Sequence, residues 1–201
     1  HPLDIKNIIE TNEHKALLLS LFSNSPYLTR LLFKYPDFSI RIFQNSADDL
    51  IEEIFSILYK GHSQFSNIPE LMSALRNAKA KVALTLAIAD LSGKWHLAKI
   101  TKALSDFAQL ALKNAVDFLL NEGLISGQIG HDVINDDVAH NSGYSVLAMG
   151  KLGGYELNYS SDIDLIVLFD LDIVKYTGRR SAQDFFVKLT QKLVKIMADR
   201  T

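Results

Sequence analysis

Two carboxylates placed two residues apart, Asp162 and Asp164, are the strongest chemical feature of the sequence. They stand at the start of the apolar run 163–169, whose residue types are typical of a buried strand. Because strand side chains alternate between faces, both acids should point the same way, with Cα atoms roughly 7 Å apart. Hard oxygen ligands in this arrangement favour Mg²⁺ or Mn²⁺. We therefore predict that Asp162 and Asp164 are catalytic and bind a divalent metal ion.

An isolated Asp-x-Asp is more often a solvated face or a turn than a metal site. The apolar neighbours Ile163, Leu165 and Ile166 argue against that simpler interpretation. They place the acids at the start of a buried strand, where an unpartnered charge would be costly. The metal hypothesis therefore depends on the surroundings of the pair as well as on the pair.

The segment before the acids has the composition of a phosphate-binding loop. Three glycines follow a second apolar run and let backbone N–H groups approach an anion, while a helix starting there would add its positive end. Two serines can donate hydroxyl hydrogens to phosphate oxygens. The order is not Gly-x-x-x-x-Gly-Lys-Ser/Thr, so this is not a Walker loop. We assign phosphate binding to Gly150, Lys151, Gly153, Gly154, Ser160 and Ser161.

The role of Lys151 has an alternative, because a lysine in a turn is as often exposed as bound to phosphate. Together, a glycine turn, two serines and an Asp-x-Asp pair predict phosphoryl or nucleotidyl transfer. That chemistry needs metal ions to neutralise phosphate charge and to activate the attacking oxygen.

The elements that must position these residues fall in the last third of the chain. The spacing of apolar residues predicts strands over 144–149 and 163–169 and a helix over 182–199 that begins at Ser181. Residues 123–143 contain Gly, Asn, Asp and His without apolar periodicity and are predicted as a loop or linker.

Helical periodicity dominates residues 1–122. A capping pattern at Ser46 predicts a helix ending near Gly61, and a short apolar turn is expected between Pro26 and Pro36. Two long helices, 68–91 and 97 to about Gly123, should form an antiparallel pair with Trp95 packed at their junction. The predicted fold class is mainly α, with a small mixed α/β part at the C-terminal end.

Composition limits the classes of protein to which the chain can belong. Its 201 residues are 48% hydrophobic, and no run is long and apolar enough to predict a membrane span. Without cysteines there are no disulfides or thiolate metal sites, which fits a cytoplasmic protein. A net charge of −2 gives no reason to expect nucleic acid as a partner. The histidines do not pair at helical spacing and are expected at the surface.

The run 150–166, Gly-Lys-Leu-Gly-Gly-Tyr-Glu-Leu-Asn-Tyr-Ser-Ser-Asp-Ile-Asp-Leu-Ile, resembles the signature of a known bacterial family. It is very similar to the nucleotidyltransferase motif of the bifunctional glutamine synthetase adenylyltransferase/adenylyl-removing enzymes. Weaker similarity covers 25–36 and 75–91. The resemblance implies that Asp162 and Asp164 are the metal-binding pair and that the six residues assigned above hold phosphate.

That family has two homologous catalytic halves, and the sequence Ser-Ser-Asp-Ile-Asp looks more like the motif of the N-terminal half. The resemblance therefore implies that phosphate removes AMP from glutamine synthetase and releases ADP. It also implies Mg²⁺ or Mn²⁺, and the PII signalling protein and glutamine as regulators of the whole enzyme. The alternative within the family is ATP-dependent addition of AMP.

Family members also carry a third carboxylate on a later strand, which this sequence does not reach by Thr201. Asp170 and Asp172 lie too close to the pair in sequence to take that role. The resemblance thus implies a helical region over 1–122 followed by a truncated nucleotidyltransferase core over 144–201. The chain begins at His1 and stops directly after a predicted helix, so we expect a fragment, and a docking or regulatory module without catalysis is the remaining alternative.

Overall fold

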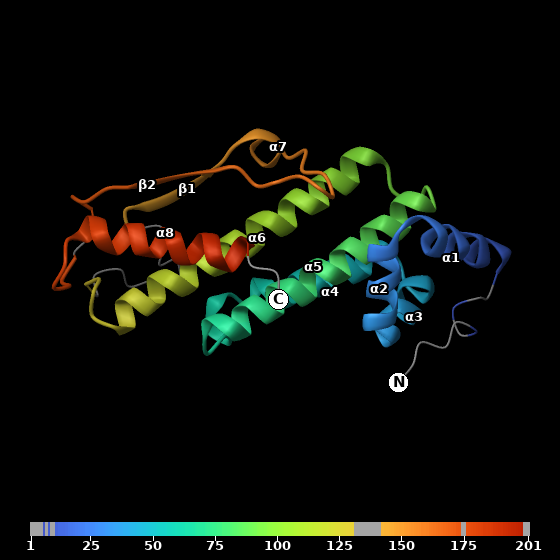
Figure 1. Ribbon diagram of the computed structural model, residues 1–201, viewed down its shortest axis with the longest axis horizontal. Helices are drawn as coiled ribbons and strands as arrows, with labels where there is room; N and C mark the ends of the chain where they lie inside the picture. The colour runs from blue at the N-terminus through green and yellow to red at the C-terminus, as the bar shows by residue number, and fades with distance from the viewer. Residues whose placement is uncertain (1–5, 7, 9–10, 131–141, 174–175, 199–201) are drawn as a thin grey trace.

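The computed structural model describes residues 6, 8, 11–130, 142–173 and 176–198. Long helices form one layer and a short sheet with a further helix lies along part of it (Figure 1). In chain order the elements are α1 (Asn12–Asn24), α2 (Pro26–Lys34), α3 (Pro36–Gln44), α4 (Ala47–Tyr59), η2 (His62–Gln64), α5 (Ile68–Leu91), α6 (Leu97–Ile125), β1 (Tyr144–Ala148), α7 (Gly150–Gly153), β2 (Leu165–Phe169) and α8 (Ala182–Ala198). The predicted class, mainly α with a small mixed part, is confirmed. None of the described helices is long and apolar enough to cross a membrane.

Side-chain caps start most of the helices, as the sequence indicates. Ser46 accepts a hydrogen bond from the Asp49 N–H at the start of α4, and Asn67 accepts one from Glu70 at the start of α5. The apolar turn expected after Pro26 is wrong. Ser25 caps a full helix there, α2, because proline fits the first turn of a helix, where its missing N–H has no helical acceptor. Within the region 1–122 predicted as helical, residues 1–5, 7, 9 and 10 lie outside the described residues.

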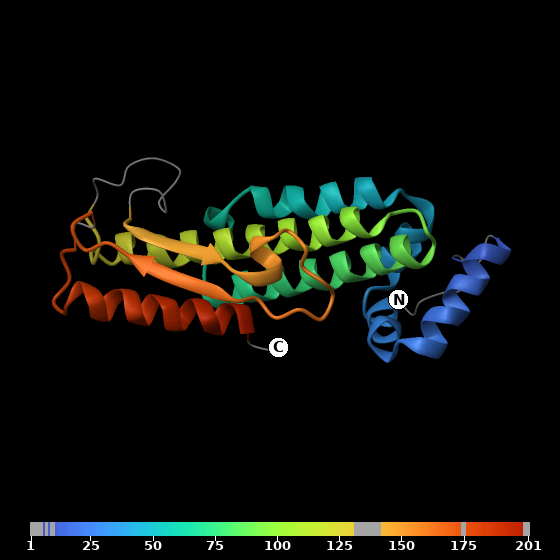
Figure 2. The same ribbon diagram turned by 90° about the horizontal axis from the view of Figure 1, so that it is seen from above.

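The α5–α6 pair forms the centre of the helical region. Its predicted antiparallel packing is confirmed (Figure 2). α4 packs against both helices. Leu84 and Leu86 of α5 and Leu120 of α6 are fully buried. Trp95 packs at the junction, as predicted, where its Nε1–H donates to Asp48 at 3.2 Å.

α6 continues to Ile125, beyond the predicted end near Gly123, so the first residues of the predicted loop 123–143 are helical. Glycine at 123 allows α6 and α8 to approach each other closely, because an added Cβ would lie 2.8 Å from the Phe185 ring. The helix ends where Gly127 adopts φ +66°. Residues 131–141 of that predicted loop lie outside the described residues.

β1 and β2 form an antiparallel pair in which Tyr144 faces Phe169 and Ala148 faces Leu165. Aromatic side chains join the sheet to α8: Phe186 stacks on Tyr144 at 5.6 Å and on Phe169 at 5.0 Å between ring centres. The Tyr144 hydroxyl also lies 2.9 Å from the Thr190 hydroxyl. The predicted helix over 182–199 is confirmed as α8 up to Ala198, and residue 199 lies outside the described residues. Ser181 accepts a hydrogen bond from the Asp184 N–H at its start.

The two strands are not buried on both faces, which corrects the prediction. Their residues alternate between a packed and an exposed face, and Leu147, Ile166 and Leu168 are about half exposed. Within the described chain, helices cover one face of the sheet only, so continuous apolar sequence does not produce a strand buried on both sides.

Candidate phosphate and metal site

Asp162 and Asp164 lie just before β2, whose first residue is Leu165 and not the predicted Ile163. The backbone still joins the sheet at that point, because the Met149 N–H donates to the Asp164 carbonyl oxygen at 2.9 Å. Exposure alternates from residue to residue here, and both acids are on the exposed side. The predicted shared orientation agrees with this pattern, whereas the predicted burial of the pair is wrong.

Exposure changes the electrostatic argument for the pair. In the described part of the chain, neither carboxylate takes part in an ion pair or a side-chain hydrogen bond, and both are exposed. An exposed carboxylate pays little for desolvation, so the pair needs no permanent cation to be stable. It is instead open to an incoming ion or ligand.

Gly150 brings the glycine turn against the acids. Its φ is +56°, a backbone conformation that glycine adopts without strain, and an added Cβ would lie 3.3 Å from Asp164 Oδ2. Glycine is therefore favoured by the backbone, and a larger residue would also press on the nearby carboxylate. The structure thus brings Gly150 and Asp164, fourteen positions apart in sequence, into one site.

The other two glycines have different surroundings. A Cβ at Gly153 would lie 2.5 Å from the Ala148 carbonyl oxygen, so this position needs a glycine for close packing of α7 on β1. Gly154 has φ −85° and ordinary neighbours at 3.6 Å or more. α7 is a single turn of helix, too short to provide the strong dipole that the sequence interpretation expected.

The predicted polar groups of the segment are only partly available. Ser161 is used within the turn, where its hydroxyl accepts a hydrogen bond from the Asn158 N–H at 3.2 Å. Ser160 and Lys151 are exposed. Their contact with phosphate stays a prediction, as does the exposed-turn alternative for Lys151.

A third carboxylate is not part of this arrangement. Within the described residues, no group of three or more His, Cys, Asp or Glu side chains is placed to hold a metal ion. Asp170 shares the exposed face of β2 but follows its other end, roughly 20 Å from Asp164 by strand rise. Its Oδ1 accepts the Asp172 N–H in the turn that follows.

Contacts with α6 hold the site segment in place, and the sequence interpretation missed them. The Leu157 N–H donates to Ser105 Oγ at 3.1 Å, and the Tyr155 hydroxyl donates to Gln109 Oε1 at 2.9 Å. The four-residue spacing of Ser105 and Gln109 indicates one face of a helix. Nothing in the sequence, however, indicates which segment lies over that face.

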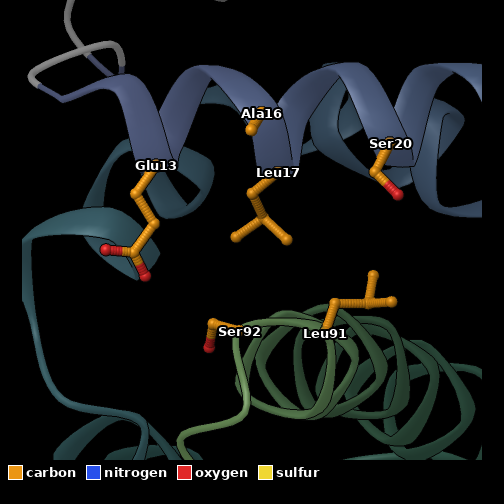
Figure 3. A pocket seen from close by; sticks show the side chains of 6 residues that line it. All are labelled: Glu13, Ala16, Leu17, Ser20, Leu91 and Ser92. Atoms are coloured by element: carbon orange, nitrogen blue, oxygen red, sulfur yellow. The ribbon is translucent and has the colours of Figure 1, made fainter.

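Two hollows in the structure lie elsewhere. One, of about 370 Å³, separates α1 from the end of α5, with Leu17 and Leu91 on opposite sides and Glu13 at one end (Figure 3). The second, of about 330 Å³, lies by Ser145 and Asp170 at the far end of the sheet. Neither is lined by Asp162 or Asp164, and both acids are exposed.

Comparison with known proteins gives a consistent result. Residues 15–201 match the family model described as glutamate-ammonia ligase adenylyltransferase. Relatives named bifunctional glutamine synthetase adenylyltransferase/adenylyl-removing enzyme are 36% identical in Rhodopseudomonas palustris, over 92% of this chain, and 36% identical in Xanthobacter autotrophicus, over 93%. A relative of the same name in Mesorhizobium japonicum is 35% identical over 92% of the chain. The matched regions make up 19% of each relative, so the chain spans about a fifth of their length.

Proposed function

The chain belongs to the glutamate-ammonia ligase adenylyltransferase family, and on that premise we propose that it provides the phosphate- and metal-binding part of an adenylyl-removing site. The substrate would be adenylylated glutamine synthetase, the enzyme in the names of its relatives. Phosphate would be the attacking group and ADP the product. The PII signalling protein and glutamine would regulate the whole enzyme.

The observation that carries this proposal is the meeting of the glycine turn with the acid pair. Gly150 lies against Asp164, and Asp162 shares the exposed side with it. Backbone N–H groups at a glycine turn suit phosphate oxygens, and the carboxylates suit the cation that accompanies them. Phosphoryl and nucleotidyl transfer require both groups within one small site.

Mg²⁺ or Mn²⁺ fits the donors that are present. Mg²⁺ in such sites is commonly held by one or two carboxylates, with water and substrate phosphate completing its six ligands. Asp162 and Asp164 would supply the carboxylates, and their exposure leaves room for the remaining ligands. The bound ion would neutralise phosphate charge and lower the barrier to nucleophilic attack. Gly150, Lys151, Gly153, Gly154, Ser160 and Ser161 would orient the phosphate groups.

The proposed reaction exchanges one phosphorus–oxygen bond for another. An oxygen of inorganic phosphate attacks the phosphorus of the AMP–tyrosyl phosphodiester on the synthetase. The bond from that phosphorus to the tyrosyl oxygen breaks, and the tyrosyl oxygen takes up a proton. The products are ADP and unmodified synthetase, with no oxidant or further reactant.

The second candidate is the opposite modification, in which ATP donates AMP to the same tyrosine and pyrophosphate leaves. The names of the relatives include both activities. The sequence Ser-Ser-Asp-Ile-Asp at 160–164 favours removal of AMP, because it resembles the motif of the family's N-terminal half. A docking role without catalysis is the third candidate, favoured by the absence of a third carboxylate from the described site.

An isotope experiment on the protein at its natural length separates these candidates. Adenylylated glutamine synthetase and labelled inorganic phosphate should yield labelled ADP. We expect Asp162→Asn and Asp164→Asn each to lower that rate at least about a hundredfold, since loss of a carboxylate weakens binding of the required ion. A second assay supplies ATP labelled in its AMP part. If no labelled ADP forms from phosphate but this label is transferred to the synthetase, the site adds AMP. Silence in both assays would favour the docking role.

Asp170→Asn is the matched control for both site variants. It removes a carboxylate from the same face of β2, roughly 20 Å from Asp164 by strand rise. Its rate should stay within about twofold of the unmodified protein, as expected of an exposed substitution away from the site. Equal losses in all three variants would show that general negative charge on this face, and not the pair, supports the reaction.

A further inference from the structure

We infer that α6 positions the acid pair through Tyr155, whose side chain holds the site segment in its working conformation. This inference rests on the proposed function, because it treats the segment 149–164 as the site. It assigns a positioning role to Tyr155 and Gln109, which do not touch the acids.

The backbone at Tyr155 adopts a conformation that favours glycine. After the single turn of α7, the Tyr155 N–H donates to the Leu152 carbonyl at 3.1 Å and the Glu156 N–H donates to Lys151 at 2.8 Å. This pair of bonds is the Schellman ending, in which the first residue past the helix cap is left-handed. Tyr155 occupies that position with φ +58°, the only positive φ at a non-glycine residue in the described chain.

A tyrosine at such a position needs a compensating contact, because the left-handed conformation is disfavoured for every residue with a Cβ. The contact is a hydrogen bond from the Tyr155 hydroxyl to Gln109 Oε1, 2.9 Å away on α6. The Lys102 ammonium group also lies 5.9 Å from the centre of the Tyr155 ring. Glycine would satisfy the backbone but make neither contact, so the side chain accounts for tyrosine at this position.

A second contact two residues later ties the same segment to the same face of α6. Ser105 is fully buried and its hydroxyl donates to the Thr101 carbonyl while it accepts the Leu157 N–H. The side chain of Leu157 is buried beside it. Ser105 and Gln109 are one helical turn apart, so the two bonds fix both the position and the direction of the chain.

A third contact reaches the end of α5. Tyr159 lies near the carboxylate of Asp90, and burial first, then that carboxylate, raise the pKa of the Tyr159 phenol. From Tyr159 only two residues remain before Asp162. The course of the chain into the acid pair is therefore set by the two long helices and not by the short sheet alone.

Two substitutions at Tyr155 and Gln109 test the role of the side chain. Tyr155→Gly relieves the left-handed strain but removes the contact with α6, whereas Gln109→Leu removes only the acceptor. The positioning role predicts that both loosen the segment. A purely local role in ending α7 predicts that Tyr155→Gly tightens it, because glycine is the preferred residue there.

The first measurement is hydrogen exchange at the Met149 N–H, which bonds to the Asp164 carbonyl and reports the order of the segment. We expect exchange about threefold to tenfold faster in both variants, the effect of losing one hydrogen bond. The amides of α8 should not change. Gln109→Glu is the matched control, because a carboxylate also accepts the Tyr155 hydroxyl, and its exchange should stay near that of the unmodified protein.

Binding of Mn²⁺ alone, followed by electron paramagnetic resonance, is the second measurement. We expect binding about threefold to tenfold weaker in Tyr155→Gly and Gln109→Leu and unchanged in Gln109→Glu. Unchanged exchange at Met149 in the first two variants would overturn the inference. If exchange responds as expected but the unmodified protein binds no Mn²⁺, positioning stands and the proposed metal site fails.

Discussion

The α5–α6 pair and the site segment 149–164 are in contact but are stabilised in different ways. Apolar side chains buried on several sides hold the helices, among them Leu84, Leu86 and Leu120. The segment buries only two leucines, Leu152 and Leu157, and depends on individual hydrogen bonds for the rest.

Because of this difference, the stability of the protein depends mainly on the helices, whereas its chemistry depends on the segment 149–164. Burial of apolar area is insensitive to small shifts in direction, whereas a hydrogen bond depends on both distance and angle. The helices can therefore stabilise the protein while the segment remains open to solvent and ligands. The predictions that follow test that separation, from the largest expected effect to the smallest.

Leu84→Ala in α5 should have the largest effect on stability. Leu84 is fully buried, and removing a buried leucine side chain costs about 2–5 kcal/mol, from lost burial and from the cavity left behind. Urea unfolding measures the change. Leu91→Ala is the control on the same helix, because Leu91 is 55% exposed and should change stability by no more than about 0.5 kcal/mol. Similar losses in both would show that the pair is not stabilised mainly by burial.

Gly150→Ala should have the opposite effect to Leu84→Ala. It should lower stability less and weaken metal binding at the site more. The left-handed φ of +56° makes alanine cost about 1–2 kcal/mol there. The new methyl group would also approach Asp164 Oδ2 at 3.3 Å and displace that carboxylate. Mn²⁺ titration should then show weaker binding than the loss of stability alone explains.

Gly154→Ala provides the comparison for Gly150→Ala. Gly154 has a negative φ and room for a methyl group, so both stability and Mn²⁺ binding should stay close to those of the unmodified protein. If alanine at 154 weakened binding as much as alanine at 150, contact with Asp164 would not be the reason for glycine at 150.

How far the sequence predicts each region follows from the same difference. Helical periodicity and caps are local, so the helices starting at Ser46, Asn67 and Ser181 could be predicted from short stretches. The helix after Pro26 was missed although its Ser25 cap is a local signal, whereas other errors arose where a distant contact matters. At Gly123, within α6, a Cβ would meet the Phe185 ring, and no local signal shows that close approach.

The sequence offers candidate residues for the site, whose roles stay a prediction, but it does not reveal their surroundings. Spacing alone predicts that Asp162 and Asp164 share a side, and the exposure pattern agrees. The acids are nevertheless exposed, because whether a strand is buried depends on the layers around it and not on its own apolar residues. The hydrogen bonds that Ser105 and Gln109 accept join residues 52 and 46 positions apart, respectively, which no periodicity reveals.

Asp48→Asn should have the smallest effect and shows how little an exposed polar contact contributes to the helical pair. Asp48 pairs with Lys99 and accepts from Trp95, but it is largely exposed, so its loss should cost about 0.2–1 kcal/mol. The hydrogen bond from Lys99 lowers the pKa of Asp48 below its ordinary value. The folded state therefore gains this contribution above about pH 4 and loses it as the pH falls through the lowered pKa.

Urea midpoints of the unmodified protein and Asp48→Asn should differ at pH 7 and converge at lower pH. Asp49→Asn, an equally exposed change on the same first turn, should produce no such convergence, and a gap that persists in acid would show that the charge of Asp48 is not what stabilises the junction.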